Sequence, residues 1–228
     1  DYPHRKIASH YLVDPTLGRK SSEYKNFVSP NCKILTGTKF IQLRESFQKR
    51  NIIRKVFLNY KNLPILIFLG GGNNISLICK IINALNNSKI ENAINLICSI
   101  KEKNEIQKVP FFNNIRFFHS LNDKELHDLF GKVSLVIGGS GSSCWERCVM
   151  GLPSIIIPIS ENQKKISQEL NHKNAAFKID EGDIKLKLIP TINSLLFDKD
   201  NNLKMSKNAS SICDGYGSKR LYEIFTRH

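Results

Sequence analysis

The chain has 228 residues, of which 41% are hydrophobic and 24% charged, and this composition is typical of a globular protein with a substantial core. No apolar run approaches the roughly 18 to 20 residues that span a bilayer, so the sequence predicts no membrane partner, and its start lacks the apolar run of a signal peptide. The formal net charge of +14 comes from lysines spread along the whole chain, which argues against a nucleic-acid partner and would suit an anionic substrate.

Residues 1–60 show little regular pattern, and we expect them to form an interdomain connection with the first strands rather than an independent domain. The predicted elements are strands at Tyr11–Val13 and Cys32–Leu35, turns at Gly18 and Gly37, and a short helix around Ile41–Arg50.

Residues 61–228 alternate short apolar runs with helical patterns, which indicates strand-helix units and a parallel sheet. The predicted strands are Pro64–Leu69, Ile94–Ser99, Ile115–Phe118, Leu135–Gly138, Ser154–Pro158 and, more weakly marked, Ala175–Ile179. The predicted helices are Ile75–Leu85, Asp123–Phe130, Ser142–Met150, Gln163–Asn171, Ile184–Leu196 and Ser218–Phe225. This order predicts an α/β protein with a Rossmann-like parallel sheet flanked by helices.

Three loops follow predicted strands at the edge of the sheet where α/β proteins bind ligands. The first contains Gly70, Gly71 and Gly72, which would let the backbone approach a ligand closely. The alternative is a tight strand-to-helix turn without a ligand, because the spacing matches neither the dinucleotide fingerprint nor a phosphate loop.

The second loop runs from Gly138 through Gly139 to Ser142 and Ser143, where a helix should begin. Its first N–H groups and the Ser142 hydroxyl could hold phosphate, while Glu146, one turn later, could accept hydrogen bonds from both ribose hydroxyls. The alternative for Glu146 is an acidic residue favoured only by the helix dipole. Two such turns after two strands favour a nucleotide.

The third loop places Asn162 and Gln163 after the strand at Ser154–Pro158, and their amides would suit sugar hydroxyls or an acylamino group. Helix capping by Asn162 is the alternative. The six cysteines are scattered without zinc spacing, which predicts a reducing, cytoplasmic protein without a structural metal or another cofactor.

The stretch GSGSSCWERC, residues 139–148, resembles the nucleotide-sugar hydrolase of pseudaminic acid biosynthesis, which removes UDP from UDP-2,4-diacetamido-2,4,6-trideoxy-β-L-altropyranose. Further stretches match the same family in order along nearly the whole chain: GLPS at 151–154, ENQ at 161–163, Asp14 with LGR at 17–19, LTG at 35–37 with LRESF at 43–47, LGG at 69–71, and DGYGSKR at 214–220. The resemblance implies the C-terminal half of a glycosyltransferase-B-type fold, whose C-terminal domain binds the nucleotide.

Within this resemblance, Glu146 matches the acidic residue expected on the ribose, and Ser142 and Ser143 fall where the diphosphate is held. Phe118 and its neighbours fall where the family's backbone meets uracil, and Asn162 matches an active-site Asn near the sugar. Two departures occur, at Gly72-Asn73 and at Pro15-Thr16, where the family usually has a hydroxyl residue with Asp and Gln-Asn, respectively.

The family's catalytic His lies in an N-terminal Gly-x-Gly-His segment, and no His of this chain has that context. The resemblance therefore implies that the chain is the UDP-binding half of the enzyme and that an N-terminal catalytic domain is its partner. Two alternatives stay open: the donor-binding domain of a glycosyltransferase, and a non-catalytic UDP-binding fragment.

Overall fold

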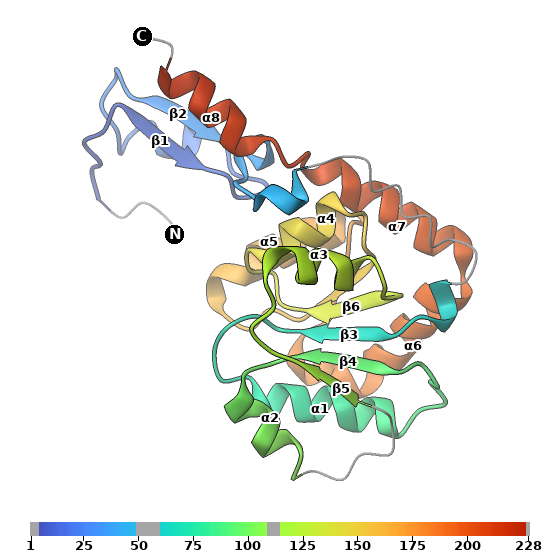
Figure 1. Cartoon of the computed structure of the whole chain (residues 1–228). Coiled ribbons are helices and arrows are strands. Elements are labelled where there is room, and N and C mark those ends of the chain that lie inside the picture. The colour runs from blue at the N-terminus through green and yellow to red at the C-terminus, as the bar shows by residue number, and fades with distance from the viewer. Residues whose placement is uncertain (1–4, 49–59, 109–114, 227–228) are drawn as a thin grey trace.

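The computed structural model describes residues 5–48, 60–108 and 115–226. The chain folds into a large α/β unit, called the large layer below, and a smaller unit beside it, called the smaller layer (Figure 1). The large layer contains a six-stranded parallel sheet in the order β5-β4-β3-β6-β7-β8. Its strands are β3 (Ile65–Phe68), β4 (Ile94–Ile97), β5 (Ile115–Phe118), β6 (Leu135–Gly138), β7 (Ser154–Ile156) and β8 (Phe177–Lys178). All six predicted strands are confirmed.

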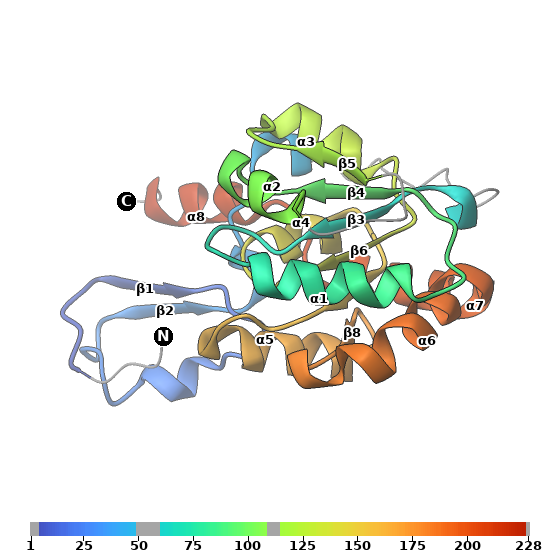
Figure 2. The ribbon, with the colours of Figure 1, turned by 90° about the horizontal axis from the view of Figure 1, so that it is seen from below.

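Helices cover both faces of this sheet, as strands without polar alternation require. They are α1 (Ile75–Asn86), α2 (Ile100–Ile106), α3 (Asp123–Phe130), α4 (Ser143–Val149), α5 (Glu161–His172), α6 (Ile184–Phe197) and α7 (Lys199–Ile212), with α8 (Gly217–Thr226) reaching the smaller layer (Figure 2). Ile65 and Ile67 face a core formed with α1 and α6, whereas Leu66 between them faces a second core formed with α3 and α4. No helix of the described residues has the length and apolarity that a membrane crossing needs.

Two helices are absent from the sequence prediction. The start of α2 carries a capping box in which Ser99 and Glu102 bond each other's backbone N–H, a signal that the prediction passed over. The start of α7 is capped by Asp198, but its many Asn, Ser and Lys residues hide the apolar stripe formed by Met205 and Ala209.

The helix predicted around Ile41–Arg50 is wrong over its described part, and its last two residues lie outside the described residues. One 3-10 turn, Glu45–Phe47, stands there instead. The segment packs closely against Gly215 and Gly217. A Cβ on Gly217 would collide with the Ile41 carbonyl, and one on Gly215 with the Phe47 carbonyl. This packing against another segment holds the backbone in an irregular path.

The smaller layer is built by the beginning of the chain together with its last helix. Strands β1 (Tyr11–Asp14) and β2 (Lys33–Thr36) form their own two-stranded parallel sheet, separate from the large one. Helix α8 lies beside them, with the Phe225 ring 4.9 Å from that of Tyr11 and Arg220 donating to the Lys39 carbonyl at 3.0 Å (Figure 1). The division of the chain after residue 60 stays a prediction.

The contact between β3 and β6 positions the loops that matter here. Phe68 stands opposite Gly138 in the register, so the two strands end side by side. A Cβ on Gly138 would lie 2.5 Å from the Phe68 carbonyl oxygen and 3.1 Å from Arg147 Nη1. Only glycine lets the strands approach this closely.

We expect Gly138→Ala to destabilise the fold by about 1 to 3 kcal/mol, because the added methyl group must push apart two paired strands. The matched control is Gly182→Ala, at a position where a Cβ meets no atom within 4 Å and φ is not positive. Urea unfolding followed by circular dichroism measures both variants, and equal midpoints for the two would contradict this account of the strand contact.

Candidate functional site

The two glycine-rich turns lie next to each other because the strands that lead into them are neighbours. The chain runs from β3 outward to β4 and β5 and then returns to the other side of β3 as β6. Ligands bind parallel sheets at such a reversal of strand order, outside the carboxyl ends of the strands. The turns after β3 and β6 are therefore the candidate site.

The first turn is open to its surroundings. Gly70 and Gly72 adopt positive φ of 93° and 110°, and all three glycines, Gly71 included, are exposed. A Cβ on Gly70 or Gly71 would meet no atom within 4 Å. The turn is anchored just beyond, where the Asn74 N–H donates to the buried carboxylate of Glu102 at 3.1 Å.

Hydrogen bonds with helix α5 fix the second turn, which follows β6. The Ser140 N–H donates to Gln163 Oε1 at 2.9 Å, and the buried Ser140 hydroxyl lies 2.8 Å from that of Ser167. Gly139 fits between the Leu69 carbonyl and the Gln163 amide, and a Cβ there would lie 3.0 Å from the former. The oxygen of Gln163 therefore shapes the turn, and only the nitrogen end of its amide is left for a ligand.

The serines of this turn differ in their surroundings. Ser142 is exposed, and its hydroxyl makes no capping bond because its own backbone is already helical, at φ −54° and ψ −38°. Ser142 thus occupies the N-cap position of α4 without a side-chain capping bond. The Ser143 hydroxyl accepts a hydrogen bond from Arg147 Nη1 at 3.2 Å. Within the described residues, the backbone N–H groups of Gly141 and Ser142 have no partner.

Glu146 is buried, with 4% of its surface exposed, and both of its oxygens face Arg44. Arg44 Nε lies 2.8 Å from Oε1 and Nη2 lies 3.4 Å from Oε2, while Nη1 bonds Asp123 at 2.9 Å. Burial raises the pKa of Glu146, and the positive charge of Arg44 opposes that rise. Sequence reasoning gave Arg44 no role, although it stands in the LRESF stretch that matched the hydrolase family.

Asn162 lies exposed on the first turn of α5, where its Oδ1 accepts a hydrogen bond from the Ser160 hydroxyl at 2.6 Å. The N-cap position of α5 is Ser160, so capping by Asn162 is not what the structure shows. The predicted helix start at Gln163 lies two residues late, since α5 begins at Glu161.

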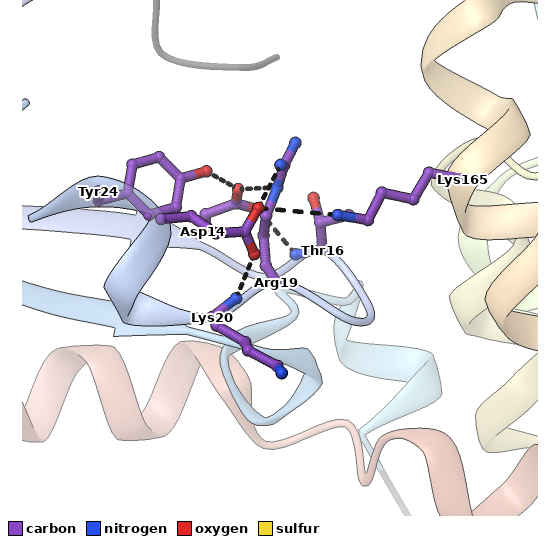
Figure 3. A network of polar contacts seen from close by, with 7 residues as sticks. Asp14, Thr16, Arg19, Lys20, Tyr24 and Lys165 are labelled. Carbon is purple, nitrogen blue, oxygen red and sulfur yellow. Dashed lines mark hydrogen bonds and ion pairs between the residues drawn. The ribbon is translucent and has the colours of Figure 1, made fainter.

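A network of polar contacts around Asp14 joins the smaller layer to α5 (Figure 3). Asp14, at the end of β1, accepts hydrogen bonds from the Thr16 N–H at 2.8 Å, from Arg19 Nε at 3.1 Å and from the Tyr24 hydroxyl. Burial raises the pKa of Asp14, but these hydrogen bonds and the Arg19 charge outweigh it and lower the pKa. Lys165 of α5 reaches toward the same network (Figure 3). The loop with the Pro15-Thr16 departure is therefore well ordered by its own contacts.

Phe118 ends the outer strand β5, which lies two strands from β3 and three from β6, the strands that lead into the glycine-rich turns. Its carbonyl accepts from the Cys98 N–H at 3.1 Å, and the Arg116 guanidinium lies 5.1 Å from its ring centre. Phe118 is one of the residues that line a groove of about 920 Å³ between strands β4 and β5 and helix α3, which extends to Pro64 and Ala93 before the strands begin. A base contact at Phe118 would have to use the ring or the next residue, exposed His119.

The cysteines belong to the core. All six are free thiols, and burial raises the pKa of Cys148 to about 12. Across residues 5–48, 60–108 and 115–226, no three His, Cys, Asp or Glu side chains are grouped so that they could hold a metal ion. His4 and His228 lie outside these ranges.

Comparisons with known proteins agree on the fold. The profile of the glycosyltransferase family 28 C-terminal domain matches residues 65–220. The structure of MurG from Acinetobacter baumannii matches with a TM-score of 0.64 at 14% identity, over 96% of this chain and 66% of that one. The glycosyltransferase VinC in complex with dTDP matches with a TM-score of 0.54 at 14% identity, over 88% of this chain and 50% of that one.

A putative UDP-N-acetylglucosamine 2-epimerase from Listeria monocytogenes also matches, with a TM-score of 0.54 at 15% identity, over 76% of this chain and 47% of that one. A comparison with curated protein sequences finds no match. The chain thus spans about half to two thirds of the length of these structures. The predicted fold, the C-terminal half of a glycosyltransferase-B-type fold, is confirmed.

The Arg44–Glu146 pair yields a prediction about stability. Replacement by Ala at position 44 leaves the buried Glu146 carboxylate without its cation, so Arg44→Ala should cost about 1 to 3 kcal/mol at neutral pH. The loss of the cation should raise the pKa of Glu146 further above its ordinary value of 4.5. The folded variant then holds a proton that the unfolded chain has released, so its stability should fall as the pH rises above that value.

Urea unfolding at about pH 5 and about pH 7 tests the sign, with the deficit of Arg44→Ala expected to be larger at the higher pH. The exposed Arg5 provides a matched control, since Arg5→Ala should leave stability unchanged at both pH values. If Arg44→Ala lost the same stability at both pH values, Arg44 would not act through the charge of Glu146, and the prediction would be wrong.

Proposed function

The chain belongs to the family of glycosyltransferase family 28 C-terminal domains, and from this premise we propose that it binds the nucleoside diphosphate part of an activated sugar, UDP in the first instance. The observation that carries the proposal is the buried carboxylate of Glu146 beside two glycine-rich turns that end neighbouring strands. This arrangement combines an acceptor for ribose hydroxyls with backbone that an anion can approach.

The diphosphate would lie over the two turns. Gly70, Gly71 and Gly72 give it an exposed backbone on one side, and on the other Gly139 leads to the free N–H groups of Gly141 and Ser142. The exposed hydroxyl of Ser142 is available to a phosphate oxygen, and that of Ser143 can donate to phosphate while it accepts from Arg147.

The ribose would bond Glu146. Arg44 already donates a hydrogen bond to Oε2 and pairs ionically with Oε1, but each oxygen has a lone pair left that can accept from a ribose hydroxyl. The cation also favours the ionised carboxylate, which makes a stronger hydrogen bond to a hydroxyl than a neutral acid does. Phe118, at the end of β5, remains the proposed neighbour of the base.

The sugar would lie near the start of α5. Asn162 is exposed there and can both donate to and accept from sugar hydroxyls, and the amide nitrogen of Gln163 adds a donor. Asn162 is the one residue that we propose for the catalytic step, as a group that orients the sugar. Its amide is neutral and cannot act as a general base.

We favour the donor-binding domain of a glycosyltransferase over a hydrolase, because the family profile and the VinC structure named above are those of glycosyltransferases. The hydrolase of pseudaminic acid biosynthesis is the second candidate. Its support is the stretch at 139–148 and the closing DGYGSKR stretch, in which Asp214 and Arg220 form an ion pair.

Either activity needs a further domain, since a base for the attacking group has no evident source among the residues proposed here. The N-terminal half is the partner that we propose, and the two-stranded sheet β1–β2 supports it because such a small parallel sheet is rarely complete by itself. The six free thiols support a reducing, cytoplasmic location.

We expect Glu146→Gln to lower the affinity for UDP about tenfold or more, because a charge-assisted hydrogen bond contributes roughly 1.5 to 3 kcal/mol. Isothermal calorimetry measures the affinity, and 2′-deoxy-UDP should lose less on mutation than UDP does. Glu105→Gln is the matched control, an exposed acid on α2 that pairs with Lys108. Unchanged binding of UDP by Glu146→Gln would remove this residue from the site.

The isolated chain should bind UDP but release none from a UDP-sugar at an enzymatic rate. Addition of the N-terminal half, supplied as a separate domain, should restore turnover if the two halves associate. Chromatography of the products then separates the candidates, since a free sugar indicates a hydrolase and a new glycoside a transferase. Robust turnover by the isolated chain, abolished by His119→Ala, would show that the catalytic residues lie in this half.

A further inference from the structure

Arg147 is the largest fully buried side chain of the described residues, with 1% of its surface exposed. It lies in the middle of α4, directly behind the turn that follows β6. A buried arginine stays charged, because its guanidinium does not lose its proton in proteins. The core of the molecule therefore holds a positive charge next to the proposed diphosphate site.

The guanidinium touches the turn itself. Nη2 donates to the Gly139 carbonyl at 2.6 Å, Nη1 donates to the Ser143 hydroxyl at 3.2 Å, and buried Nε has no hydrogen-bond partner. A Cβ on Gly138 would lie 3.4 Å from the guanidinium carbon, so the glycine leaves room for the flat group. Both ends of the turn are thus tied to one cation.

No acid forms an ion pair with Arg147 among the residues that the structure describes. The adjacent Glu146 directs its carboxylate to Arg44, and its charge acts on Arg147 only without a direct contact. The nearest thiols, Cys144 and Cys148, stay neutral because burial raises the pKa of each well above its ordinary value. Arg147 has only neutral acceptors.

The burial of a charge without an ion pair is unfavourable, and an apolar side chain of similar volume would stabilise the core more. The position of the guanidinium gives a reason for a buried arginine at this place. The turn that the guanidinium binds is thin, being built of Gly139, Ser140 and Gly141, so an anion on its outer side would lie within electrostatic range of the cation inside.

We propose that Arg147 is a positioning residue for a diphosphate: it fixes the turn from Gly139 to Ser143 and supplies, from the interior, the positive charge that favours a multiply charged ligand over an uncharged nucleoside. This inference rests on the proposed function. It assigns the preference for the diphosphate to a residue that the ligand does not touch.

The test uses the full chain and compares two ligands that share base and ribose and differ by the charged diphosphate. Calorimetry with UDP and with uridine should show that Arg147→Gln lowers the affinity for UDP about tenfold or more, while that for uridine changes less than about twofold. Arg147→Lys, which keeps the charge and loses the fork, should retain more of the UDP affinity than Arg147→Gln does. Equal losses for UDP and uridine, or no loss for UDP, would overturn the proposal.

A second measurement needs no variant, in case replacement of Arg147 prevents folding. Inorganic pyrophosphate, which has neither base nor ribose, should raise the melting temperature of the unmodified chain and compete with UDP. The absence of both effects would overturn the role of Arg147. Failure of UDP to bind at all, with pyrophosphate still binding, would overturn the proposed nucleotide function and leave an anion site at the turn.

Discussion

The candidate site depends on the return of the chain from β5 to the far side of β3. Once β6 pairs with β3, the turns after both strands open at the same edge, and Gly138 opposite Phe68 makes their approach close. Helix α5 then fixes the second turn through Gln163, and the smaller layer contributes Arg44 to the acid that follows. This one reversal of strand order brings together the two turns proposed for the diphosphate.

Two arginines act on opposite sides of the same short helix. Arg44 is partly exposed and approaches the buried Glu146 from outside the helix, whereas Arg147 is enclosed and, among the described residues, bonds a backbone carbonyl and a hydroxyl. The outer pair controls the ionisation of an acid, and the inner cation makes the turn electropositive without an exposed charge. Two adjacent residues of the helix therefore have different roles: Glu146 can accept hydrogen bonds from hydroxyls, and Arg147 supplies a positive potential that attracts anions.

The strands were predictable because short, continuous apolar runs such as those of β3 and β6 are typical of strands that are buried on both faces of a parallel sheet. The turns followed from their glycines. The partner of Glu146 was not predictable, since Arg44 lies 102 residues away and in a segment without periodicity. Nor was the burial of Arg147, because Cys144 to Cys148 are buried all round the helix, and no polar face distinguishes an enclosed arginine from a solvated one.

Helix α8 has a consequence for the order in which the protein is made. Residues 5–48 are translated before the rest of the described chain, yet their small sheet packs against the Phe225 ring and the Arg220 side chain, which are synthesised about two hundred residues later. Domains usually fold during synthesis in chain order. Here the large sheet can form before β1 and β2 find their partner helix, so the small sheet is completed after the large one although its strands are translated earlier.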